Sequence, residues 1–208
     1  MNMIHFTEET YEKALIKLFQ DLGYTYKSGY DVDRDPHEPY YREELEKQIR
    51  NINPGIPQEA IDEALRKLYD MNDFTLIQNN EKFMDALQNG LEAEIPWSGE
   101  MRTYRVKLVS YKYVNANSFL IVNQWRVEEK NNKIRLDLAV LINGLPLVVI
   151  ELKTPSGGAK AHDAYMQIKN YQQKCPVLFT YNVLDKPMAS RMRFTVSWKR
   201  TSWSMSER

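Results

Sequence analysis

Two acids and an amine, Asp137, Glu151 and Lys153, have the types and spacing that metal-dependent phosphodiester cleavage requires. They stand in apolar runs, at residues 136–138 and 148–153, where a charged side chain is seldom buried without a partner. On an expected strand, Glu151 and Lys153 are two residues apart and point to the same face. The triplet alone does not distinguish a catalytic centre from an exposed strand end that carries a Glu–Lys pair.

The dipeptide Asn143-Gly144 predicts a β-hairpin between the strand that carries Asp137 and the strand that carries Glu151. A two-residue loop would set Asp137 opposite Ile150 and point it to the face away from Glu151. A three-residue loop, in either of its two placements, brings both acids to one face, about 4.5–8 Å apart. The candidate site therefore requires an odd-length loop.

Two carboxylates at that separation repel each other unless a cation lies between them. Mg²⁺ suits the site, because it binds one or two carboxylates together with waters and a phosphate. A bound Mg²⁺ polarises a phosphate and lowers the pKa of a bound water. Lys153 would orient that water and offset charge on the phosphate, and the backbone carbonyl of Leu152 would complete the coordination.

Three more polar residues are candidates for the same site. Gln167 and Tyr171 are four residues apart on an expected helix, so they share one face. Glu12, on the first expected helix, would add a further acid near the metal. The plainer interpretations are that Gln167 and Tyr171 are ordinary helix residues without a functional role and that Glu12 lies on a solvated helix face.

The surrounding elements predict an α/β fold with a mixed central β-sheet flanked by helices and an N-terminal helical insert at about residues 40–90. Apolar residues at helical spacing predict helices at residues 10–22, 42–52, 59–69, 80–88 and 159–174. Alternation and β-branched residues predict strands at residues 104–109, 118–127, 134–142, 145–153 and 177–180. Residues 24–41 and 154–158 are expected to be loops. Residues 188–208 are either a poorly integrated tail or contain an ordinary strand at 193–198.

Composition excludes several classes of function. The 208 residues carry 28 Lys and Arg against 28 Asp and Glu, which argues against non-specific coating of nucleic acid. The single cysteine, Cys175, fits a reducing, cytoplasmic setting and is expected to be a plain structural thiol. Three widely spaced histidines argue against a zinc site. Neither a signal peptide nor a membrane-spanning run is recognisable, so no membrane partner is expected.

The longer strings LDLAVLINGLPLVVIELKTP and AYMQIKNY, with the opening TEETYEKALIKLFQDLGY, resemble a known family. It is the N-terminal nuclease domain of the R (HsdR) subunit of type I restriction-modification enzymes, in the PD-(D/E)xK superfamily. The resemblance covers residues 4–182, more loosely between 40 and 89, and Leu136 replaces the proline of the motif.

This resemblance implies a restriction-endonuclease-like fold and gives the residues roles. Asp137 and Glu151 would bind metal, Lys153 would be catalytic, and Gln167 and Tyr171 would support cleavage. Glu12 matches an acid of the family's first helix.

The resemblance also implies an organisation and partners. Residues 1–185 would be the nuclease domain and 186–208 a tail. The implied substrate is double-stranded DNA, and the implied partners are the methylation (M) and specificity (S) subunits. Family members continue into an ATP-driven motor. This chain has no Gly-x-x-x-x-Gly-Lys-Ser/Thr loop, so we expect no ATP site here and interpret the chain as a fragment. Two alternatives are a catalytically silent, truncated DNA-binding or assembly module of the restriction complex and a repair-type or Holliday-junction nuclease of the same superfamily.

Overall fold

A four-stranded sheet forms the centre of the molecule in the computed structural model, which describes residues 7–72, 74–152 and 161–183. Its strand order is β1-β4-β5-β6, where β1 is parallel to β4 and the other neighbours are antiparallel. The strands are β1 (Thr25–Ser28), β4 (Phe119–Glu129), β5 (Asn132–Ile142) and β6 (Leu145–Ile150). The expected mixed sheet is confirmed.

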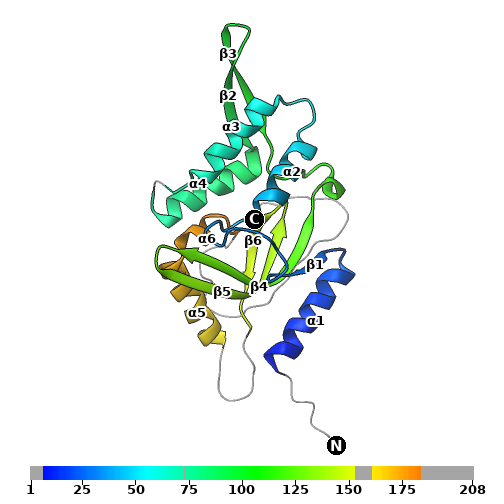
Figure 1. The fold of residues 1–208 in the computed structure, drawn as a ribbon, viewed down its shortest axis with the longest axis vertical. Coiled ribbons are helices and arrows are strands. Elements are labelled where there is room, and N and C mark those ends of the chain that lie inside the picture. Colours follow the sequence, from blue (N-terminus) through cyan, green and yellow to red (C-terminus); the bar gives the residue numbers. More distant parts are fainter. Residues whose placement is uncertain (1–6, 73, 153–160, 184–208) are drawn as a thin grey trace, which may run out of the picture.

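Helices cover both faces of this sheet (Figure 1). Helix α1 (Glu8–Asp21) begins at Thr7, whose side chain accepts a hydrogen bond from the Thr10 amide. Its buried Ile16 and Phe19 pack against one face of the sheet. Helices α5 (Ala161–Lys174) and α6 (Pro176–Thr180) pack against the other face, where a separate apolar cluster contains Trp125 and Leu136. Burying such large side chains stabilises the fold by roughly 1.5–3 kcal/mol each.

A second group of elements lies at one end of the sheet (Figure 1). It contains α2 (Arg42–Ile52), α3 (Gln58–Tyr69), α4 (Leu76–Asn89) and a separate hairpin of β2 (Leu91–Trp97) and β3 (Glu100–Val106). A short 3-10 turn, Val114–Ala116, leads from this group to β4. The apolar faces of these helices share a core with the end of the β5–β6 hairpin, so the group is anchored to the sheet.

The structure differs from the sequence expectations in three elements. The expected loop at 24–41 contains β1, which is only four residues long and shows no clear alternation. Strand β2 is not among the expected strands, because two acids and a proline interrupt its apolar residues. The strand expected at 177–180 is instead helix α6, which begins at Pro176. A short apolar run fits either conformation, and a proline in the first helical turn favours the helix.

Candidate active site

The β5–β6 hairpin brings Asp137 and Glu151 together by a route that the sequence did not indicate. Ile142 pairs with Leu145, so the turn has two residues, and the expected odd-length loop is wrong. Asn143 and Gly144 both have positive φ, 51° and 80°, as a tight two-residue hairpin turn requires.

A β-bulge in β6 then changes the register. Leu141 pairs with Pro146, but Val140 pairs with Val148, so one extra residue, Leu147, stands in β6. Beyond the bulge Leu138 pairs with Ile150, which is the last pair of the two strands. The same register continued by one residue sets Asp137 opposite Glu151. The bulge therefore supplies the one-residue shift that the loop was expected to supply.

A hydrogen bond fixes the Asp137 carboxylate where β6 ends. Its Oδ2 accepts from the backbone N–H of Leu152 at 2.7 Å. Strand β6 ends at Ile150, so Glu151 and Leu152 follow the strand, and both are half-buried like Asp137. Lys153 lies outside the described residues, and so does the loop expected at 154–158.

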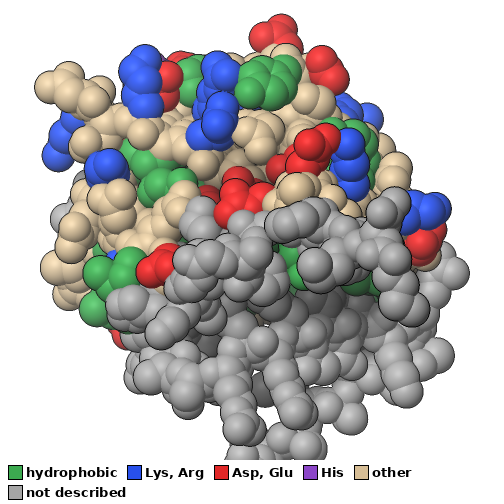
Figure 2. Space-filling view, turned by 90° about the horizontal axis from the view of Figure 1, so that it is seen from below, with side chains coloured by type: hydrophobic (Ala, Val, Ile, Leu, Met, Phe, Trp, Pro, Cys, Tyr) green, Lys and Arg blue, Asp and Glu red, His purple; other side chains and the backbone are tan. Residues whose placement is uncertain are grey.

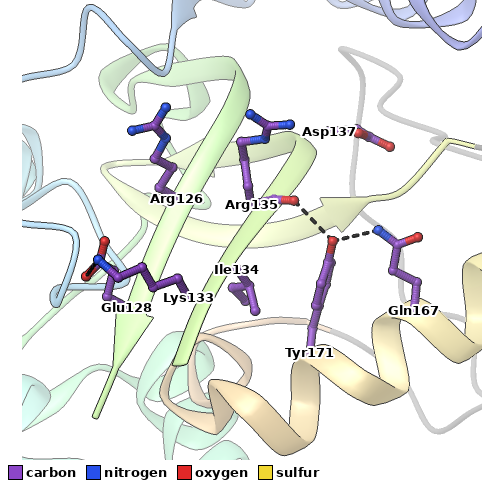
Figure 3. A pocket seen from close by; sticks show the side chains of 8 residues that line it. All are labelled: Arg126, Glu128, Lys133, Ile134, Arg135, Asp137, Gln167 and Tyr171. Atoms are coloured by element: carbon purple, nitrogen blue, oxygen red, sulfur yellow. Dashed lines mark hydrogen bonds and ion pairs between the residues drawn. The ribbon is translucent and has the colours of Figure 1, made fainter. Parts of the chain in front are cut away.

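Helix α5 supplies Gln167 and Tyr171 to the same place (Figure 3). The Tyr171 hydroxyl donates to the backbone carbonyl of Arg135 at 3.1 Å, and it accepts from Gln167 Nε2 at 2.6 Å. Burial raises the pKa of the Tyr171 phenol, and the neighbouring carboxylates of Glu151 and Asp137 raise it further, while the Gln167 amide opposes the shift. The phenol therefore lies within electrostatic reach of both acids.

Glu12 reaches the strand next to Asp137 rather than Asp137 itself. Its two carboxylate oxygens accept from Asn123 Nδ2 at 2.7 Å and from Gln124 Nε2 at 3.2 Å. Gln124 lies in register opposite Asp137, because the flanking pairs are Asn123–Leu138 and Trp125–Leu136.

Gln124 also has a strained backbone, with φ of 52° in the middle of β4. A non-glycine residue in that conformation often marks a functional site. Asn123 and Gln124 are site neighbours that the sequence reasoning missed. Their signal was available, because they are two adjacent amides inside an otherwise apolar run.

Asp137 and Glu151 supply only two carboxylates to a possible metal site. No group of three His, Cys, Asp or Glu side chains that could hold a metal occurs within residues 7–72, 74–152 and 161–183. Asp137 and Glu151 with the Leu152 carbonyl nevertheless suit Mg²⁺, because this ion retains several waters and needs only one or two carboxylates. The donor set fits Mg²⁺ better than Zn²⁺, which prefers nitrogen and sulfur ligands.

A pocket of about 580 Å³ opens beside Asp137. Gln167 and Tyr171 line it from α5, and the basic residues Arg126, Lys133 and Arg135 line it from β4 and β5. Figure 2 shows Asp and Glu side chains gathered near the centre of one face, with Lys and Arg side chains on the surface around them. Because the formal net charge of the chain is zero, its attraction for an anion such as a phosphate must come from local groups of basic side chains like this one.

Two further sequence expectations concern Cys175 and membranes. Cys175 is a buried free thiol, and burial raises its pKa, which disfavours the reactive thiolate. Among the described residues, no helix has the length and apolarity needed to cross a membrane.

Comparison with known proteins identifies the family. Residues 5–205 match the family described as the type I restriction enzyme R protein N terminus. A putative type I restriction enzyme MjaIXP endonuclease subunit from Methanocaldococcus jannaschii is 32% identical over 179 residues, which are 82% of this chain and 17% of the relative. The HindI endonuclease subunit from Haemophilus influenzae is 29% identical over 185 residues, 84% of this chain and 18% of the relative.

A shorter match reaches higher identity. The SauCOLORF180P endonuclease subunit from Staphylococcus aureus is 44% identical over 66 residues, 31% of this chain and 7% of the relative. The chain thus spans less than a fifth of the length of the first two relatives. It belongs to the family of type I restriction enzyme R protein N-terminal regions.

Proposed function

We propose that this chain is a Mg²⁺-dependent endonuclease domain that hydrolyses phosphodiester bonds in double-stranded DNA. One observation carries the proposal: the Asp137 carboxylate accepts from the Leu152 amide, one residue after Glu151, beside a pocket that Asp137, Gln167 and Tyr171 line together. Membership of a family whose relatives are named endonuclease subunits supports it. The Asp-Glu-x-Lys pattern with this hairpin is the arrangement of the PD-(D/E)xK nucleases, to which we assign the site.

In this mechanism Asp137 and Glu151 would hold the metal, and the Leu152 carbonyl would be a third ligand. The Leu152 amide fixes one oxygen of Asp137, which leaves the other oxygen for the metal. When bound, Mg²⁺ polarises the scissile phosphate and acidifies an attacking water. We assign the orientation of that water to Lys153.

The remaining residues hold the two acids in place. Tyr171 keeps its proton at neutral pH, because its pKa is raised, and it ties α5 to the Arg135 carbonyl of β5. Gln167 orients the phenol, and Glu12 holds the strained Gln124 opposite Asp137. Positioning of this kind contributes to the rate by holding the reacting groups in productive geometry.

We further propose that the domain acts within a larger assembly. The relatives that it matches are several times longer, and the ATP-driven motor of the parent subunit would lie in their additional length. Sequence recognition would come from the specificity subunit, together with the methylation subunit. A hydrolytic centre contacts phosphates, and phosphate contacts do not distinguish one base sequence from another.

A plasmid-nicking assay tests the proposal. The 208-residue chain should convert supercoiled plasmid to nicked and linear forms with Mg²⁺, and EDTA should stop the reaction. Asp137→Ala and Lys153→Ala should each lower the rate by more than about 100-fold, because even groups that merely support a metal ligand contribute 10–100-fold. Lys112→Ala, at an exposed position far from Asp137 in the sequence, is the matched control and should cut normally.

Two outcomes would count against the proposal. Cleavage that survives both Asp137→Ala and Lys153→Ala would overturn the site. A chain that unfolds cooperatively, and is therefore folded, but never cuts with Mg²⁺ would instead indicate a silent assembly module.

A further inference from the structure

Two arginines stand directly opposite each other beside the candidate site. Arg126 of β4 and Arg135 of β5 are cross-strand partners, and both side chains are exposed. Figure 3 shows them extending in the same direction from adjacent strands, with Asp137 beyond Arg135. Like charges in this position destabilise a sheet. Neither guanidinium forms an ion pair with any carboxylate of the described part of the chain. An anion that binds both guanidinium groups would remove this repulsion.

Tyr30 shows that the space between the arginines favours a negative oxygen. Its hydroxyl accepts a hydrogen bond from Arg135 Nη1 at 3.4 Å, and the Arg126 guanidinium lies 4.9 Å from its ring centroid. The adjacent Arg126 guanidinium lowers the pKa of the Tyr30 phenol, and Arg135 contributes to the same shift. Tyr30 is 60% exposed, so an oxygen from solvent or from a ligand can reach the same donors.

The position of the pair relative to the acids suggests its ligand. Arg135 precedes Asp137 by two residues on β5, which corresponds to roughly 7 Å along the strand. That separation is similar to the distance between neighbouring phosphates of one DNA strand. Arginine is suited to phosphate because its planar fork donates two parallel hydrogen bonds.

We propose that Arg126 and Arg135, with Tyr30, hold the DNA backbone phosphate next to the scissile phosphate. This inference rests on the proposed nuclease function, since it places the clamp relative to the Asp137 and Glu151 centre. The clamp positions the strand and reads no sequence, because a phosphate is the same at every base. It also explains how a chain without net charge engages DNA.

The test measures DNA binding separately from cleavage. All variants carry Asp137→Ala, so no cutting disturbs the measurement, and binding to a short duplex is followed by fluorescence anisotropy at about 50–200 mM salt. Adding Arg126→Gln and Arg135→Gln together should weaken binding at least tenfold. The change should also reduce the slope of log K against log salt by about 0.9, the value for one lost phosphate contact.

Three controls make the result specific. Arg102→Gln, an exposed arginine of β3, should leave the affinity and the slope unchanged. Arg135→Lys should retain the slope of log K against log salt, because the positive charge remains. Its affinity for DNA should fall, because lysine lacks the planar guanidinium that donates two parallel hydrogen bonds to a phosphate. The thermal unfolding temperature of the double variant should stay close to that of its parent, since the variant loses the repulsion between two like charges together with the contacts of both arginines with Tyr30.

If the slope of log K against log salt does not change in the double variant, the proposed clamp is wrong. It is also wrong if Arg102→Gln changes that slope by the same amount. A lower unfolding temperature would point to a structural role instead and would also overturn it. Absence of measurable binding by the Asp137→Ala chain, even at the lowest salt, would contradict it as well. The proposed function is judged independently, by plasmid nicking with the parent chain.

Discussion

At the scale of single residues, Tyr171 is the side chain that connects most of the candidate site. Its hydroxyl joins α5 to β5 through Arg135, accepts from Gln167 and lies near both Glu151 and Asp137. The sequence predicted that these residues would work together, because their types and order are distinctive. It did not indicate the role of Tyr171 as a bridge to a backbone carbonyl, since such a bond depends on how the helix packs.

Tyr171→Phe is expected to affect the rate more than the fold. Losing one hydrogen bond of this kind should lower the free energy of unfolding by about 0.5–1.5 kcal/mol. Loss of the positioning contact should lower the Mg²⁺-dependent nicking rate by about 10–100-fold. Urea unfolding and plasmid nicking measure the two effects. Tyr165→Phe, at a more exposed tyrosine of the same helix, is the matched control, and equal effects in both variants would contradict this role.

At the scale of elements, the β5–β6 hairpin decides whether the acids can meet. The dipeptide Asn143-Gly144 located the turn, but the register could not be predicted. The bulge at Leu147 lies in an apolar run without glycine, and the neighbouring Pro146 fits an edge strand as well as a bulge. Strand β1 was missed for a related reason, because its four residues gain their conformation from pairing with β4 and not from their own pattern.

Gly144 makes this hairpin sensitive to a single methyl group. A Cβ at this position would lie 2.6 Å from the Tyr41 carbonyl oxygen and 2.7 Å from the Leu45 amide nitrogen, at the start of α2. Gly99, in the β2–β3 turn, has a similar positive φ of 89°, but a Cβ there would meet no atom within 4 Å.

Gly99→Ala should therefore cost only the conformational strain, about 1–2 kcal/mol. Gly144→Ala should cost a further 1–3 kcal/mol or so, because α2 must also move. Equilibrium urea unfolding of the two variants gives the difference directly. Equal losses would show that the hairpin end and α2 do not pack as closely as these distances require.

At the scale of the whole molecule, the candidate site and the helical group lie in different regions. The site lies beside β5, β6 and α5, whereas α2, α3, α4 and the β2–β3 hairpin extend from the end of the sheet (Figure 1). The mixed sheet and its flanking helices could be predicted from periodicity and order. The way the two regions join could not, because it depends on long-range aromatic contacts that leave no local pattern.

Tyr181 is the main aromatic link between these regions. Its hydroxyl donates to the Leu68 carbonyl of α3 at 2.9 Å, and its ring contacts Tyr40 and Phe83 edge-on. Tyr181→Phe removes this hydrogen bond, although the Leu68 carbonyl still accepts from the Met71 amide, so the free energy of unfolding should fall by about 0.5–1.5 kcal/mol. The nicking rate under stabilising conditions should stay unchanged, because Tyr181 does not line the pocket beside Asp137.

The same tyrosines predict how stability depends on pH. Burial raises the pKa of Tyr181, Tyr40 and Tyr69 well above the ordinary value. A raised folded-state pKa means that the unfolded chain loses these protons first, so stability is complete below about pH 10 and falls as the pH rises further. Urea unfolding between neutral pH and about pH 11, with tyrosinate absorbance as a second signal, measures this loss. Tyr181→Phe should make the loss shallower, whereas the exposed Tyr113→Phe should not, and the same pH dependence in both variants would contradict the assignment.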